Sequence, residues 1–429
     1  VLELCHQLNV PVVPRGAGTG LSGGALPHKE GVVLSTAKMK NIKRIDQLAQ
    51  IAVVQPGVRN LAISQAVDSL DLYYAPDPSS QIACTIGGNV AENSGGVHCL
   101  KYGLTVHNVL RVRVVMMDGE IVEFGSEAPD SPGLDLLALF IGSEGLLGVV
   151  TEVTVKLTPK PACAKLIMAS FDTANEAGEA VAAIISAGII PAGLELMDKA
   201  TTAAVEPFVK AGYDLDAAAI LLVESDGTEA EVDDEIQKMK QVLETSGARS
   251  LQISENEQQR LLYWAGRKSA FPAIGRISPD YYCMDGTIPR KRLGEMLGAI
   301  GEMEKKYGLG CANVFHAGDG NLHPLIMFDA NIPGELEKAE QFGGEILELS
   351  VKFGGSVTGE HGIGAEKINQ MCVQYGENEL RHFHQVKEAF DPAGLLNPGK
   401  AIPSLHRCAE YGAMIVHNGE VPFPDLPRF

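Results

Sequence analysis

The sequence predicts a two-domain protein in which strands and helices are both frequent, and three observations support this. The chain has 429 residues, which exceeds the size at which a single hydrophobic core usually stops growing. Short strand-like runs with glycine turns fill residues 1–160, whereas strands alternate with long amphipathic helices over residues 161–390. Prolines and glycines then end the helical region, and a C-terminal segment, residues 391–429, follows.

The first region opens with the pattern of a dinucleotide-binding loop. Residues 14–24, PRGAGTGLSGG, contain GTGLSG, which satisfies the G-x-G-x-x-G pattern of a Rossmann turn. A Rossmann turn must open a helix that leads back to a parallel strand, but the strand-like run GVVLS already begins at Gly31. No crossover helix fits. The glycines still suit close approach of backbone N–H groups to a pyrophosphate, and a flexible surface turn is the alternative.

Periodicity predicts the elements that follow. Residues 109–125, VLRVRVVMMDGEIVEFG, read as a β-hairpin with a type I′ turn at Asp118-Gly119. In the second region the strand AAAILLVES, residues 217–225, precedes the amphipathic helix TEAEVDDEIQKMKQVLETSG. The stretch TPKPA, residues 158–162, is a candidate linker between the two regions.

Two further glycine-rich stretches favour a binding role for the first. Residues 76–103 combine glycines, prolines and small polar residues over a length that is unusual for a simple connection. Residues 140–155, FIGSEGLLGVVTEVTV, add another glycine turn that passes into a strand. Each stretch alone could be a connector. Three of them in one region indicate loops that wrap around an elongated polar cofactor.

Charge and cysteine content limit the class of protein. The net charge of −19 disfavours nucleic acid and anionic lipid as main partners. The eight cysteines show no C-x-x-C spacing and are expected to be buried free thiols of a reducing compartment, neither disulfides nor metal ligands. No apolar run reaches membrane-spanning length. Because the chain opens inside a helical pattern without Met, we expect a preceding N-terminal stretch, which leaves a targeting segment open.

Candidate metal ligands occur in two loops of the second region. In FHAGDGNLHPLIMF, His316 and His323 lie on either side of a glycine-containing turn that could bring both imidazoles together. A second loop, SVTGEHGIG, offers Glu360 and His361. Two imidazoles and a carboxylate suit Zn²⁺, Mn²⁺ or Fe²⁺ with positions left for a substrate. Isolated histidines are more often structural, which is the alternative for each pair.

The glycine-rich stretches resemble a known cofactor-binding domain. PRGAGTG, PDP, GGNxAxNSGG and IGSEGxLGVxTE are similar to the FAD-binding domain of the vanillyl-alcohol oxidase and p-cresol methylhydroxylase relatives. The resemblance implies an α+β fold: a two-part FAD-binding domain, an α+β cap domain with an antiparallel sheet, and a C-terminal segment that returns to the FAD domain. Because Thr19 stands where covalent members carry histidine, we expect non-covalent FAD.

The same resemblance implies the cofactor-binding residues. Those expected at the phosphates are Arg15, Gly16, Gly18, Thr19 and Gly20. Those expected along the ribityl chain and flavin are Pro76, Asp77, Ser79, Gly87, Gly88, Asn89, Asn93, Ser94, Gly95 and Gly142, together with Asn397 near the C-terminus.

The second region is similar to the FAD- and metal-dependent D-2-hydroxy acid dehydrogenases. The resemblance implies that His316, His323 and Glu360 bind the divalent metal and that His361 is the catalytic base. Arg267, in YWAGRK, matches the arginine that binds the substrate carboxylate, and its neighbour Lys268 is expected to be solvated. A metal would stabilise the charge that develops as the substrate hydroxyl loses its proton.

Two departures from the relatives predict the substrate. Relatives that act on 2-hydroxyglutarate hold a distal carboxylate at positions that match Cys283 and Leu325 here, and neither residue can do so. We therefore expect oxidation of glycolate, or D-lactate, to the 2-oxo acid. The resemblance further implies a cytoplasmic protein whose electrons pass to quinone through a second flavin subunit and an iron–sulfur subunit at the membrane face. A D-lactate dehydrogenase acting alone, an accessory flavin electron-transfer subunit and a metallohydrolase are the alternatives.

Overall fold

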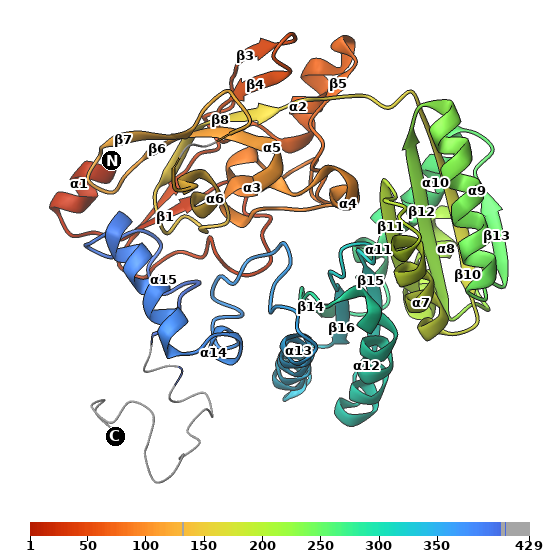
Figure 1. Cartoon of the computed structure of the whole chain (residues 1–429). Helices are drawn as coiled ribbons and strands as arrows, with labels where there is room; N and C mark the ends of the chain where they lie inside the picture. The colour runs from red at the N-terminus through yellow and green to blue at the C-terminus, as the bar shows by residue number, and fades with distance from the viewer. Residues whose placement is uncertain (131–132, 405–407, 409–429) are drawn as a thin grey trace.

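The computed structural model describes residues 1–130, 133–404 and 408, and it divides into two β-sheet regions (Figure 1). In the N-terminal region an antiparallel sheet has the strand order β3-β4-β8-β6-β7. The strands are β3 (Ile42–Asp46), β4 (Ile51–Val54), β8 (Val149–Lys156), β6 (Val109–Val115) and β7 (Ile121–Gly125). The short pair β5 (Leu72–Tyr73) and β9 (Thr158–Pro159) lies beside it. The sheet shares one apolar core with the helices of the glycine-rich stretches, which fixes where those stretches lie.

Short helices follow the N-terminal strands. They are α2 (Asn60–Val67), a 3₁₀ turn η1 (Asp68–Leu70), α3 (Ile86–Glu92), α4 (Cys99–Tyr102), α5 (Thr105–Asn108) and α6 (Leu136–Phe140). Ile86 and Val90 of α3 are buried in the same apolar cluster as Val153 and Val155 of β8, the strand that α3 contacts. Because α3 begins directly after Thr85, this packing holds its glycine-rich first turn at the edge of the N-terminal region.

The chain start and the last described segment pack together. α1 (Leu2–Gln7) leads to β1 (Val12–Arg15), which pairs in parallel with β2 (Val32–Ser35). The described residues between β1 and β2 form no helix, which confirms that the first glycine loop is not a Rossmann unit. After α14 (Met371–Gln374) and α15 (Glu377–Phe390), the Asn397 amide donates to the Val12 carbonyl at 2.8 Å. Residues 405–407 and 409–429 of the expected returning segment lie outside the described residues.

The second region is an antiparallel sheet with helices on both faces, which confirms the predicted fold class. Its strand order is β13-β10-β12-β11-β15-β16-β14. The strands are β10 (Cys163–Phe171), β11 (Gly193–Asp198), β12 (Ala219–Gly227), β13 (Ser250–Ile253), β14 (Asp280–Cys283), β15 (Cys311–Phe315) and β16 (Pro324–Phe328). Alternate residues of β10 enter two different apolar clusters, so both faces are covered and the strands read as continuous apolar runs.

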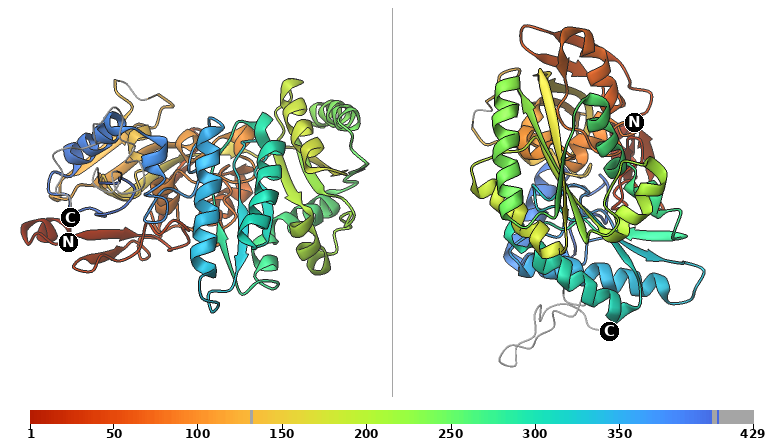
Figure 2. Two further views of the ribbon diagram at one scale, coloured as in Figure 1. Left: turned by 90° about the horizontal axis from the view of Figure 1, so that it is seen from below. Right: turned by 90° about the vertical axis from the view of Figure 1, so that its right-hand side faces the viewer.

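Each face of this sheet has its own helices. One face carries α7 (Ala174–Ser186), α9 (Glu229–Thr245), α12 (Leu293–Tyr307) and α13 (Glu335–Lys352), with the 3₁₀ turn η2 (Arg290–Arg292) before α12. The other carries α8 (Lys199–Val209), α10 (Glu257–Lys268) and α11 (Ala270–Ile274). Figure 2 shows α12 and α13 side by side, at the half of the sheet nearer the N-terminal region.

Two predictions about local structure are wrong. The 109–125 hairpin has no type I′ turn, because only Gly119 adopts a positive φ and Asp118 does not. The Gly119 amide donates to the Met116 carbonyl, the pattern of a type I turn closed by a glycine bulge. The cysteines are not all free either, since Cys372 and Cys408 form a disulfide across 36 residues. The spacing of these two cysteines matches no disulfide motif, so the sequence did not predict the pair. The two segments meet only in the folded chain.

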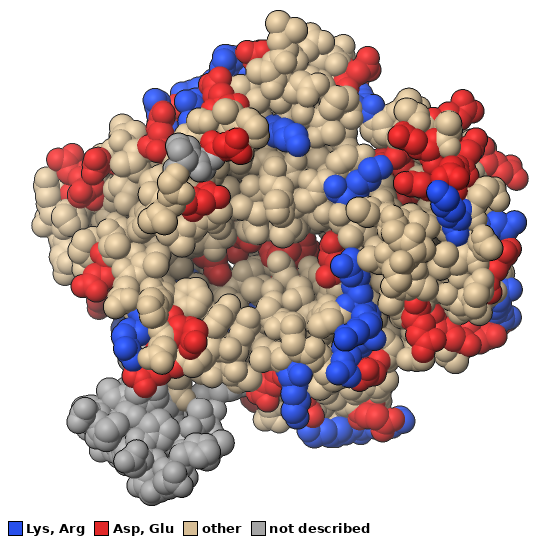
Figure 3. All heavy atoms as spheres, viewed as in Figure 1, with Lys and Arg blue, Asp and Glu red and all other residues tan. Residues whose placement is uncertain are grey.

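The acidic residues of the chain are distributed over its surface. Asp and Glu side chains are spread over both regions on the face drawn in Figure 3, and no single patch collects them. Within the described ranges, every helix is too short or too polar to cross a lipid bilayer.

Candidate active site

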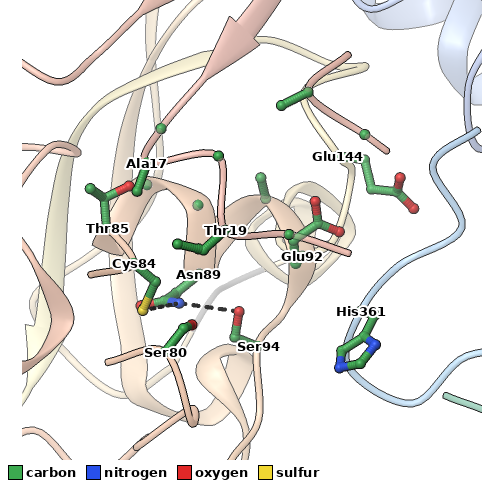
Figure 4. Close-up of a pocket in the computed structure, with 18 of the residues that line it drawn as sticks. Ala17, Thr19, Ser80, Cys84, Thr85, Asn89, Glu92, Ser94, Glu144 and His361 are labelled. Atoms are coloured by element: carbon green, nitrogen blue, oxygen red, sulfur yellow. Dashed lines mark hydrogen bonds between the residues drawn. The ribbon is translucent and has the colours of Figure 1, made fainter. Parts of the chain in front are cut away.

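A cavity of about 470 Å³ lies where the two regions meet. The N-terminal region lines it with residues of the first glycine loop, of the 78–94 stretch and of the third glycine run. The second region contributes His323, Glu360 and His361, together with Lys268 and Phe271. In Figure 4, Thr19 and Asn89 lie on one side of this cavity and His361 reaches toward it from the opposite loop. The cavity therefore joins the predicted cofactor loops to the predicted metal ligands.

The glycines of the first loop leave space that larger residues would fill. A Cβ on Gly16 would lie 2.5 Å from Thr85 Oγ1, closer than real contacts allow. Gly18 has φ +74°, and its Cβ would lie 2.6 Å from Arg15 Nη2. The first turn of α3 presents Gly87 and Gly88 to the same space. Backbone of this kind can approach a phosphate chain closely, so the donor groups fit FAD.

Most residues predicted to bind FAD line this cavity. They are Arg15, Gly16, Gly18, Thr19, Gly20, Ser79, Gly87, Gly88, Asn89 and Ser94. Asn89 also holds the loop, because its side-chain amide donates to Ser94 Oγ at 3.2 Å and accepts from Asn60 at 3.1 Å. Both of these bonds fix polar groups that border the cavity.

The other predicted FAD residues do not line the cavity. The Pro76 carbonyl accepts from Asn60, Asp77 pairs with His98, and Asn93 accepts from the Val106 amide. The Gly142 amide donates to Val90, and Asn397 donates to the carbonyls of Gly24 and Glu144. Gly95 faces the second region, since a Cβ there would lie 2.6 Å from Glu360 Oε2. These contacts shape the loops, and Gly95 lets them approach the histidine cluster.

The histidine hairpin forms as expected from its turn. His316 directly follows β15 and His323 directly precedes β16, so the antiparallel pairing brings their rings to 5.0 Å. Glu360 Oε1 from the other loop lies 3.3 Å from His316 Nε2 and 3.2 Å from His323 Nε2. Both Nε2 atoms are buried without a hydrogen bond from the described residues. Donor atoms of these three residues lie within 4.8 Å of one another, a geometry that suits one divalent cation.

Asp285 is a site residue that the sequence did not reveal. Its buried carboxylate accepts hydrogen bonds from the consecutive amides of Gly359, Glu360 and His361, at 2.9–3.1 Å. Lys367 Nζ donates to it at 3.0 Å. Burial raises the pKa of Asp285, but Lys367 and nearby histidines outweigh this and hold it well below its usual value. With its oxygens engaged in this way, Asp285 anchors the Glu360-His361 loop and is a poorer metal donor than Glu360.

His361 lies between the cluster and the cavity. Its ring stacks on His323 at 4.8 Å, with an angle of 5° between the ring planes. Burial lowers its pKa to about 4, and the repulsion from His323 and Lys367 adds to this effect. The imidazole is therefore unprotonated near neutral pH and can accept a proton.

Lys268 is exposed, as expected, whereas its neighbour Arg267 is buried. Arg267 is buried, and its Nε donates to Glu195 Oε2 at 2.7 Å. The exposed Lys268 lines the cavity beside His323 and Glu360, whereas Arg267 does not. Sequence reasoning missed this because neighbouring helical residues point about 100° apart, and no pattern said which would face the cavity.

The two positions used to predict substrate length are core positions. Cys283 of β14 and Leu325 of β16 are cross-strand partners in the apolar cluster under α8, α10 and α11. Neither lines the cavity. The preference for a short substrate therefore stays a prediction.

A pair of acids from the N-terminal region borders the same space. Glu144, with φ +52°, accepts hydrogen bonds from the Ile363 and Gly364 amides at 2.7 Å each. Glu92 lines the cavity next to it, and a Cβ on Gly362 would meet both carboxylates. Burial raises the pKa of Glu92 well above its usual value, and the charge of Glu144 adds to the shift. Glu144 thus ties the third glycine run to the loop that carries His361.

Comparisons with known proteins agree with this architecture. Residues 1–125 match a family described as FAD binding domain, and residues 160–401 match one described as FAD linked oxidases, C-terminal domain. The chain is 62% identical to glycolate oxidase subunit GlcD of Escherichia coli (strain K12) over 429 residues, 100% of this chain and 86% of the relative. It is 41% identical to glycolate oxidase subunit GlcD of Bacillus subtilis (strain 168) over 401 residues, 93% of this chain and 85% of the relative.

A solved structure extends the likeness to the fold. p-Cresol methylhydroxylase with substrate bound superposes with a TM-score of 0.78 at 18% identity, covering 95% of this chain and 87% of that chain. The vanillyl-alcohol oxidase type of fold expected from the glycine-rich stretches is therefore confirmed, and the N-terminal region binds FAD. On the match over residues 160–401 and the identity to its relatives, the chain belongs to the family of FAD-linked oxidases.

Proposed function

We propose that this protein oxidises glycolate to glyoxylate, with D-lactate as a second substrate, and that it uses FAD and a divalent metal. The observation that carries the proposal is the convergence of His316, His323 and Glu360 beside an unprotonated His361, at the end of a glycine-lined cavity. The relatives named as glycolate oxidase subunits support the choice of substrate.

The residues present fit both groups. The glycine cradle around Gly16 and Gly18 would hold FAD, and Thr19 in the first loop cannot form the histidyl link of covalent relatives. Two buried imidazole nitrogens and one carboxylate would hold Zn²⁺, Mn²⁺ or Fe²⁺. When bound, FAD supplies the electron acceptor and the cation supplies positive charge for the substrate oxygens.

The side chains have distinct tasks in this reaction. His361 accepts the proton of the substrate hydroxyl, because its lowered pKa keeps the ring neutral. Asp285 holds the backbone of His361 and Glu360, so the base keeps its position relative to the metal ligands. We propose that the substrate carboxylate is bound at the C-terminal end of α10, where Lys268 lines the cavity. We assign catalysis to His361 and carboxylate binding to Arg267, whose guanidinium is buried against Glu195 next to Lys268 and does not itself line the cavity.

The names of the relatives support a proposal about partners. Because the relatives at 62% and 41% identity are named as subunits, we propose that a second flavin subunit and an iron–sulfur subunit take the electrons on toward quinone. We place this complex in the cytoplasm, with peripheral contact at the inner face of the membrane. The domain limits 1–160, 161–390 and 391–429 are part of the same proposal.

Anaerobic flavin reduction tests the substrate. Glycolate and D-lactate should bleach the flavin absorbance, whereas L-lactate and D-2-hydroxyglutarate should not. His361→Ala should retain FAD but lose bleaching, and His382→Ala, an exposed histidine on α15, is the matched control. A purified protein without flavin absorbance would favour a metallohydrolase. A flavoprotein that no 2-hydroxy acid reduces would favour an accessory electron-transfer subunit.

A further inference from the structure

One buried carboxylate contacts both a proposed metal ligand and the arginine next to the site. Glu195, on β11, is 1% exposed, and its Oε1 lies 2.7 Å from His316 Nδ1. Its Oε2 accepts from Arg267 Nε at 2.7 Å and lies 2.7 Å from Arg267 Nη2. Glu195 lies on β11, and His316 directly follows the neighbouring strand β15. Arg267 comes from helix α10.

The contact with His316 determines which ring nitrogen is available. A carboxylate only accepts hydrogen bonds, so His316 Nδ1 must carry the proton. The lone pair of the neutral ring is then on Nε2, the atom that lies 3.3 Å from Glu360 and has no hydrogen bond. Glu195 thus fixes the imidazole in the tautomer that can bind a cation.

The Glu195 carboxylate also fixes the guanidinium of Arg267. The guanidinium is 1% exposed, and a buried positive charge needs a partner. Paired contacts of Nε and Nη2 with one carboxylate oxygen restrict the plane of the guanidinium. Moving Glu195 would therefore disturb the metal ligand and the arginine together.

We propose that Glu195 is a positioning residue, which orients His316 for metal binding and holds the Arg267 guanidinium in place beside the site at the same time. This rests on the proposed function. It adds a residue that no sequence motif indicated, because the apolar strand context GLELMD around Glu195 resembles ordinary core.

The test measures Mn²⁺ binding to the purified flavoprotein without substrate, by the loss of the electron paramagnetic resonance signal of free Mn²⁺. Glu195→Gln should bind Mn²⁺ about 10–100-fold more weakly than the parent. Its KM for glycolate should also rise more than its kcat falls. The matched control is Glu224→Gln, which alters a carboxylate on the adjacent strand β12 that is equally buried and also contacts a histidine and an arginine. This control should bind Mn²⁺ like the parent.

A double variant separates positioning from charge balance. Glu195→Met/Arg267→Met removes both buried charges and should regain thermal stability, yet should bind Mn²⁺ as weakly as Glu195→Gln or more so. Parent-like Mn²⁺ affinity in either variant would overturn the inference while leaving the proposed function intact. A parent protein that binds no Mn²⁺ would instead count against the metal of the proposed function.

The parent protein itself offers a further test, in which a variant serves only to assign the signals. In protein labelled with ¹⁵N-histidine, the His316 signals, assigned by comparison with His316→Gln, should show a protonated Nδ1, and Zn²⁺ should shift Nε2. Zn²⁺ bound through Nδ1 would overturn the inference.

Discussion

Two buried glutamates on neighbouring strands make the same kind of contact with different consequences. Glu195 of β11 contacts His316 and Arg267, and Glu224 of β12 contacts His98 and Arg260. Against the lowering effect of burial, Asp77 and Glu224 raise the pKa of His98 to about 10. The residue types do not separate the two triads.

The second ring nitrogen separates them. His98 Nδ1 pairs with Asp77 at 2.9 Å and Nε2 with Glu224 at 3.1 Å, so both nitrogens are used and the ring ties the 76–103 stretch to the second sheet. His316 Nε2 faces another histidine and Glu360 without a hydrogen bond. A completed triad stabilises the contact between the regions, whereas an incomplete one is a candidate binding site.

The largest expected difference is in activity. His316→Ala should slow glycolate-driven flavin reduction about 10³-fold, because it removes one ligand of the proposed metal and with it several kcal/mol of charge stabilisation. His98→Ala should leave the rate per folded molecule close to that of the parent. Stopped-flow absorbance measures both. Equal losses of activity in the two variants would show that a free ring nitrogen does not distinguish an active-site histidine from a structural one.

For stability we expect the opposite order, in which His98→Ala destabilises the fold more than His316→Ala does. His98→Ala leaves Asp77 and Glu224 without their shared cation, and it should lower the free energy of unfolding by about 3–5 kcal/mol. Urea unfolding followed by flavin fluorescence measures the change. An unchanged midpoint would mean that the His98 triad does not hold the regions together.

Lys268 should have a smaller effect on binding. Because Lys268 is exposed at the cavity, Lys268→Met should raise the KM for glycolate less than about tenfold and leave kcat unchanged. Arg267→Lys should change both constants, since it disrupts a buried pair. Steady-state kinetics at two salt concentrations checks this. If the change in KM caused by Lys268→Met were the same at both concentrations, the prediction would be contradicted.

The stability of the parent protein should also depend on pH. His98 has a pKa of about 10 when folded and an ordinary value of 6.5, so its stabilisation is complete below about pH 6.5 and is lost as pH rises toward 10. The stability difference between the parent and His98→Ala should narrow over this range. Thermal unfolding at several pH values measures it, and a constant difference would exclude a charged His98.

Local sequence was a good guide where short spacing fixes geometry. The turn between His316 and His323 predicted that both rings would lie close together. Because Glu360 and His361 are adjacent in the sequence, they were expected to reach the site together. The absence of a helix after the first glycine loop was equally predictable, because too few residues separate it from the next strand.

Long-range partners were not predictable in this way. Asp285 supports the Glu360-His361 loop across more than 70 residues, and Cys372 meets Cys408 although their spacing has no motif. The choice between Arg267 and Lys268 depends on how α10 is rotated against its sheet. Such contacts depend on how whole elements pack, which a local pattern does not encode.

The sequence by itself determined the glycine loops, the two-region α+β architecture and the residue types of the proposed metal centre. These depend on backbone freedom, hydrophobic period and donor chemistry, which are properties of short segments. Only the tertiary structure decided that the His316 ring keeps a free nitrogen while the His98 ring does not. That difference arises because partners from distant strands and loops either fill or leave open the last hydrogen-bonding position of each ring.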